Sequence, residues 1–115
     1  MAKIKRAKAI LRNYHALEAR KYVGDLDAIC TLIDLEIAVT LAQLTDRQFE
    51  ALRLVYGEDL TQAGAGKCMG VSQVAVKQFV DDTIARIDEV YEAWAWLDGE
   101  LSADDFTENY ELEAV

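Results

Sequence analysis

Residues 44–80 have the sequence LTDRQFEALRLVYGEDLTQAGAGKCMGVSQVAVKQFV, and this stretch decides the fold. Thr45 followed three positions later by Gln48 is the pattern of a capping box at the start of a helix. Gly70 predicts a tight turn, because glycine permits the positive φ that other residues resist. Ser72 follows at once and is suited to cap the next helix. The stretch therefore predicts two helices, a sharp turn and a further helix.

The rest of the chain extends this pattern to an all-α fold of about five helices. The sequence of 115 residues contains no proline, and its apolar residues recur at the 3.6-residue period of a helix. We expect helices over 4–22, 26–43 and 45–57, a short one between Thr61 and Gly70, and a long one over 73–97. Asp25 and Thr61 are expected to cap the second and fourth of these. In the short helix, two glycines are expected to lower local stability.

The second predicted helix is apolar on most of its circumference. Two stripes run along it, one of Leu26, Cys30, Ile33, Ile37, Leu41 and Leu44, and one of Ile29, Leu32, Leu35 and Val39. Such a helix is normally buried on several sides. It is therefore either the central helix of the core or part of an oligomer interface. In the third helix, the residues expected to face the core are Phe49, Leu52, Val55 and Tyr56.

A continuous apolar stripe also marks the long last helix, formed by Val76, Val80, Ile84, Ile87, Tyr91 and Trp94. It either packs on the first two helices or forms a dimer contact.

We expect a helical hairpin over 1–44 for packing or oligomerisation, a second unit over 45–97, and an acidic tail over 98–115. The net charge is −9, distributed as +6 over residues 1–24, −4 over 25–80 and −11 over 81–115.

Composition excludes several functions. The chain has no apolar run long enough for a membrane span, which requires about 20 residues. Cys30 and Cys68 are expected to be buried thiols in a reducing, cytoplasmic environment. One histidine and two separated cysteines do not make a zinc site. Neither the histidine nor the carboxylates have the spacing of a catalytic site. We therefore expect neither an enzyme nor a metal or other cofactor.

Within 44–80, the residues Leu44, Thr45, Arg47, Leu52, Leu54, Tyr56, Leu60, Thr61, Met69, Gly70, Val71, Ser72, Val76 and Gln78 follow one pattern without gaps. This pattern resembles the helix-turn-helix in region 4 of sigma-70-type transcription factors. The resemblance implies that the last helix enters the major groove of duplex DNA. It covers about a third of the chain. Nothing in the chain resembles sigma region 2, so promoter melting is not implied.

The resemblance implies DNA contacts from five residues. Arg47 would contact a phosphate, while Ser72, Gln73, Lys77 and Gln78 would face the bases at the start of the last helix. The family commonly has arginine and glutamate where this chain has Gln73, Val74 and Ala75. Lys77 replaces another arginine. These departures predict an altered specificity, with Val74 and Ala75 placed to touch thymine methyl groups.

The arrangement as a whole is similar to small sigma-like proteins of phages and prophages, of which the ArpU-type regulators are the nearest group. We therefore expect a transcription regulator that binds DNA as a dimer in the cytoplasm of a bacterial host and contacts RNA polymerase. One alternative is a protein like the small subunit of a phage packaging terminase, which also joins a helix-turn-helix to oligomerising helices. Another is an acidic interaction module that binds polymerase or a host factor without DNA, which the acidic tail and missing arginines favour.

Overall fold

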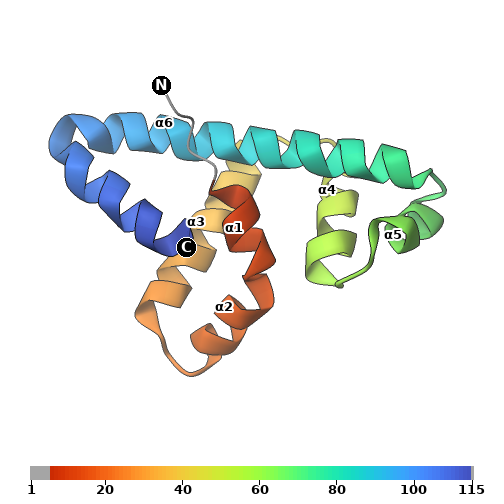
Figure 1. The fold of residues 1–115 in the computed structure, drawn as a ribbon, viewed down its shortest axis with the longest axis horizontal. Helices are drawn as coiled ribbons and strands as arrows, with labels where there is room; N and C mark the ends of the chain where they lie inside the picture. The colour runs from red at the N-terminus through yellow and green to blue at the C-terminus, as the bar shows by residue number, and fades with distance from the viewer. Residues whose placement is uncertain (1–5, 115) are drawn as a thin grey trace.

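The computed structural model describes the backbone of residues 6–114 and the side chains of residues 6–97. These residues form α1 (Ala7–Arg12), α2 (Tyr14–Tyr22), α3 (Leu26–Leu41), α4 (Asp46–Leu52), the π-helical turn η1 (Arg53–Gly57), α5 (Gln62–Met69) and α6 (Gln73–Ala114). No strand occurs in this part of the chain, so the predicted all-α class is confirmed. Figure 1 shows most of α6 along one side of the molecule, with α1–α3 beneath one half and α4 and α5 beneath the other, while the C-terminal part of α6 folds back beneath the rest of that helix.

Two helix boundaries differ from the prediction. The helix expected over 4–22 is interrupted at Asn13, whose φ of −101° and ψ of 13° are not helical. The Asn13 side-chain amide donates to the carbonyl of Ala9 at 2.9 Å, so it competes with the backbone for that acceptor. At the other end, α6 continues to Ala114, where a tail had been expected after residue 97. The added stretch contains no proline to end the helix.

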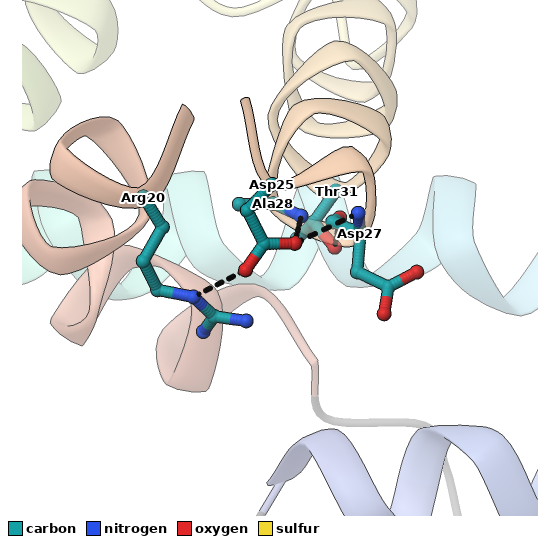
Figure 2. Close-up of polar contacts among 5 residues, drawn as sticks. All are labelled: Arg20, Asp25, Asp27, Ala28 and Thr31. Atoms are coloured by element: carbon teal, nitrogen blue, oxygen red, sulfur yellow. Dashed lines mark hydrogen bonds and ion pairs between the residues drawn. The ribbon is translucent and has the colours of Figure 1, made fainter. Parts of the chain in front are cut away.

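The connection between α2 and α3 follows the prediction closely. Gly24 has a positive φ of 86°, and Asp25 begins α3 by accepting from the backbone N–H groups of Asp27 at 3.0 Å and Ala28 at 3.2 Å. The guanidinium of Arg20 donates to the same carboxylate at 2.9 Å (Figure 2). The hydrogen bond from Ala28 and then the one from Arg20 hold the pKa of Asp25 below its ordinary value.

One apolar cluster joins α1, α2, α3, α4 and α6. Its buried members are Ala7, Ile10, Leu11, Leu17, Ala28, Leu32, Leu35, Ala38, Ala42, Leu52, Ile87 and Tyr91. The start of α1 is fixed to α6, because the Asp88 carboxylate accepts from the N–H groups of Arg6 at 3.0 Å and Ala7 at 2.8 Å. The Arg6 guanidinium lies 5.1 Å from the ring centre of Tyr91. The second half of the α6 stripe thus packs on the N-terminal helices.

A second apolar cluster joins α4, η1, α5 and the beginning of α6. It consists of the buried residues Ala51, Leu54, Ala65, Met69, Val76 and Val80. Ile84 and Tyr56 touch both clusters. The stripe predicted along the last helix is therefore confirmed: Val76, Val80, Ile87 and Tyr91 are buried, and Ile84 and Trp94 are partly buried. The apolar face of α6 packs on both clusters and joins them.

The helix α3 is less buried than its sequence suggests. Its inner face consists of Ala28, Leu32, Leu35 and Ala38, followed by Ala42. The other stripe is exposed, with 74% of Leu26, 50% of Ile33, 45% of Ile37 and 55% of Leu41 open to water. The reason is geometric, because the other helices pack on one side of α3 only. Of the two predicted alternatives, burial as the central helix of the core does not hold for this stripe.

Three further predictions of burial are wrong. Cys30 belongs to the exposed stripe of α3, and Cys68 is exposed on α5, so neither thiol is buried. Phe49 is 49% exposed, because it lines an open groove between α3 and the α4–η1 segment. In the described part of the chain, no helix is long and apolar enough to cross a membrane. No group of three metal-binding side chains occurs there either.

Candidate nucleic-acid interface

The helix α4 begins with the capping box that the sequence predicts. The hydroxyl of Thr45 accepts from the backbone N–H of Gln48 at 3.2 Å, and the side-chain carbonyl of Gln48 accepts from the N–H of Thr45 at 3.0 Å. Two N–H groups that a helix start leaves without partners are satisfied in this way. The start of α4, with Arg47 in its first turn, is therefore held in a defined orientation.

The end of α4 widens into the turn η1. There the N–H of Glu58 donates to the carbonyl of Arg53, five residues earlier, at 3.0 Å. The two side chains also form an ion pair. Asp59 follows with a positive φ of 57°, and His15 of α2 lies 3.5 Å from its carboxylate. The wide turn and this contact set the direction in which the chain leaves for α5.

The helix α5 and the sharp turn after it explain the glycines of this stretch. Thr61 caps α5 by accepting from the N–H of Gly64 at 3.0 Å. Gly70 ends it with φ 72° and ψ 30°, as predicted. At Gly66, an added Cβ would lie 2.7 Å from the carbonyl oxygen of Val71, which is too close for any side chain. Gly66 is therefore required where α5 meets the turn, although glycine inside a helix lowers its stability.

The last helix begins at the residue that the sequence predicts. The hydroxyl of Ser72 accepts from the N–H of Ala75 at 3.1 Å, and its carbonyl accepts from the N–H of Val76 at 3.1 Å. Val76 is fully buried against the second cluster, so the first turn of α6 cannot rotate about its axis. Ser72 thus has a structural role as a cap in addition to its place at the expected site.

Arg47 connects two helices of the site. One guanidinium nitrogen donates to the carbonyl of Met69 at 2.8 Å, at the end of α5, and lies 3.5 Å from the carboxylate of Glu50. A cation is favourable at the carbonyl end of a helix. About half of the Arg47 side chain, 51%, remains exposed. The sequence predicts a phosphate contact for Arg47 but does not reveal that it also holds α4 against α5.

The structure brings the other predicted site residues together on the exposed start of α6. Ser72, Gln73, Lys77 and Gln78 are all exposed there. Val74, which has an exposed fraction of 77%, lies between them and packs on little. The four polar residues come from the first two turns of a single helix, directly after the sharp turn. In a helix-turn-helix, this is the part of the second helix that meets base edges in the major groove.

Two carboxylates one turn further along α6 change the electrostatics of this surface. The ammonium of Lys77 lies 2.7 Å from the carboxylate of Asp81, and the side-chain amide of Gln78 donates to Asp82 at 2.9 Å. These i, i+4 pairs are visible in the sequence, because Asp81 and Asp82 each lie four positions after their partners. They lower the positive potential that Lys77 would otherwise present to phosphate groups.

Lys67 is a further exposed base, in the last turn of α5 beside the turn that leads to α6. The sequence reasoning did not single it out. In a helix-turn-helix, the first helix crosses the DNA backbone. A base on α5 is therefore suited to a phosphate contact, and the signal that could have identified it is a lysine in the last turn of the helix before Gly70.

The arrangement of α4, α5, the turn at Gly70 and α6 defines a helix-turn-helix domain of the DNA-binding class. Residues 40–89 match the family model for sigma-70, region 4, so this part of the chain is a sigma-70 region 4-like helix-turn-helix. The match extends on both sides of the stretch that first indicated it. No curated protein and no solved structure matches the chain.

Proposed function

We propose that the protein is a transcription regulator of phage or prophage type that contacts duplex DNA through the first two turns of α6. The observation that carries this proposal is the exposure of Ser72, Gln73, Lys77 and Gln78 on one rigidly held helix start. Glutamine side chains can form two hydrogen bonds with adenine, and lysine can reach guanine or a phosphate. Arg47 and Lys67 would contact phosphates and set the register on the duplex.

Region 4 of sigma factors associates with RNA polymerase as well as with DNA, and the family match supports the same role here. The regulator would bind upstream of a promoter and recruit the polymerase of its bacterial host. The departures at Gln73, Val74 and Ala75 favour a target other than the standard −35 element, because the arginine contacts to guanine are missing.

The test is a fluorescence-anisotropy titration against a randomised duplex pool and against fragments of the cognate genome, over a series of salt concentrations. We expect sequence-selective binding that weakens steeply as salt rises, because phosphate contacts release counterions. The double variant Gln73→Ala/Lys77→Ala should lose selective binding and keep its helical circular-dichroism spectrum. Lys21→Ala removes one positive charge from α2, outside the helix-turn-helix, and should retain selectivity. Equal selectivity in the double variant would exclude α6 as the DNA-contacting helix.

A second candidate function is a protein-interaction module that binds RNA polymerase or a host factor without DNA. Two observations favour it. The carboxylates of Asp81 and Asp82 bind the side chains of Lys77 and Gln78, and the C-terminal third of the sequence is strongly acidic. Co-purification with polymerase together with no DNA affinity near physiological salt would support this candidate. Ring-sized oligomers in light scattering would instead favour the terminase-like alternative.

A further inference from the structure

The outward face of α3 leaves an apolar stripe without a packing partner among the described residues. It consists of Leu26, Cys30, Ile33, Ile37 and Leu41, which we call the α3 stripe. A fully exposed large aliphatic residue has about 200 Å² of accessible surface, so the four aliphatic members of the stripe leave roughly 450 Å² open to water. An apolar patch of this size on a monomer is often functional. Nothing in the proposed DNA-binding role uses this surface, because α3 precedes the helix-turn-helix.

At its centre the stripe borders a groove. Ile33 lines a cavity of about 480 Å³ between α3, the N-terminal helices and the α4–η1 segment, and half-exposed Phe49 lines it from the other side. A standard protein interface buries about 800 Å² on each partner, with an apolar centre and a polar rim. The stripe and the rim of this groove together supply the apolar part of an interface of that size.

The spacing of the stripe indicates which partner fits. Its members lie at steps of four, three, four and four residues, and the first three steps are those of a coiled-coil seam. The order of steps is nearly the same from either end. When two copies of α3 lie antiparallel, apolar positions therefore meet apolar positions along the whole seam, as a two-fold symmetric interface requires. We propose that the α3 stripe is the interface of a homodimer, formed by α3 of each copy in antiparallel orientation.

The charges beside the stripe give this dimer a distinctive property. Asp27 and Glu36 flank the apolar positions on α3, and the helix contains no base. In a dimer formed by two copies, acids of one copy approach acids of the other, which opposes association at low ionic strength. The dimer should therefore become tighter as salt rises. A basic partner helix on the same face would respond in the opposite direction.

The two native cysteines provide a direct test in the unmodified full chain. Cys30 lies in the stripe, whereas Cys68 is exposed on α5 outside it. Sedimentation equilibrium without DNA should show a monomer–dimer equilibrium that shifts toward dimer between about 50 and 500 mM salt. Over the same range of protein concentrations, Cys30 should become protected from a thiol-specific alkylating reagent, followed by peptide mass spectrometry, while Cys68 keeps its rate. A monomer at every concentration and salt, or a dimer in which Cys30 stays as reactive as Cys68, would refute the proposal.

Two variants separate this face from the other exposed apolar surface. Ile33→Glu adds an acid from each copy at the centre of a seam that acids already flank, and should weaken the dimer by at least about tenfold. Leu97→Glu makes the same change at the 68% exposed Leu97 of α6 and should leave the dissociation constant unchanged. Loss of the dimer in Leu97→Glu alone would move the interface to α6 and reject the α3 stripe. Because these measurements contain no DNA, their outcome is independent of the proposed transcriptional role.

Discussion

At the scale of single residues, the site depends on close contacts that only particular side chains allow. Gly66 is buried where α5 meets the turn, and the carbonyl of Val71 occupies the space where a Cβ would be. Arg47 holds the end of α5 through the Met69 carbonyl. The Gly66 contact fixes the angle between α5 and α6, and the Arg47 contact holds α4 against α5. The angle between α5 and α6 determines whether the first turns of α6 can enter a groove.

The substitution Gly66→Ala should lower the free energy of unfolding by about 1–3 kcal/mol, because a methyl group forced against backbone atoms displaces the turn. Urea denaturation followed by circular dichroism measures this change. Gly57→Ala is the matched control, since its Cβ would lie 3.7 Å from the Arg53 side chain, an ordinary contact. A stability of Gly66→Ala equal to that of the control would mean that the turn can relax.

Asp25 should give the fold a dependence on acidic pH. Its folded-state pKa lies below the ordinary value, first because of the Ala28 N–H and then because of Arg20. The stabilisation is thus present above about pH 4, the usual range of an aspartate, and is lost as pH falls through the lowered pKa. Asn is also a good cap. Asp25→Asn should therefore reduce the loss in thermal unfolding temperature between pH 6 and pH 2.5, and Arg20→Ala should reduce it in part. An acid response identical to wild type in both variants would contradict this assignment.

At the scale of helices, the sequence predicts where helices begin and where the chain turns better than it predicts which helices pack against one another. The caps at Asp25, Thr45, Thr61 and Ser72 and the left-handed Gly70 were all predicted, because each depends on residues within a few positions of one another. The sequence left open whether the second stripe of α3 is buried in the core, because periodicity shows that a face is apolar but not how many helices pack on it. The Arg47–Met69 contact spans 22 positions, and no local pattern signals it.

The acidic turn of α6 should weaken DNA binding. Asp81→Asn removes the carboxylate that pairs with Lys77, so the lysine becomes available to a phosphate. We expect a several-fold higher affinity for duplex DNA at low salt, and a salt dependence steeper by about one counterion. Glu89→Gln makes the same change in net charge two turns further along α6 and should have a smaller effect. Equal effects of the two variants would mean that net charge alone matters, and that the Lys77–Asp81 pair does not control binding.

At the scale of the whole molecule, α6 makes one folding unit of two apolar clusters. Ile87 is fully buried in the first cluster and Met69 is buried in the second, while Ile84 and Tyr56 touch both. Residues on both sides of the predicted boundary between 44 and 45 contribute to the first cluster, Ala42 before it and Leu52 after it.

Ile87→Ala and Met69→Ala should each destabilise the protein by about 2–5 kcal/mol, the usual range for removing a large buried side chain. Although the two residues lie in different clusters, each variant should unfold in a single transition with coincident near- and far-ultraviolet signals. A biphasic curve in either variant would show that the clusters unfold separately. Chemical denaturation followed in the near and far ultraviolet distinguishes one transition from two.

The capping of α1 by Asp88 also has a consequence during synthesis. The bond from the Arg6 N–H spans 82 positions, so the ribosome must release Asp88 from its exit tunnel before the first helix can gain this cap. Until then the apolar side of α1 has no α6 to cover it, and contacts so distant in sequence form slowly. The first helix is thus synthesised before α6 but gains its contacts with α6 only afterwards. Until then its apolar side is accessible to chaperones.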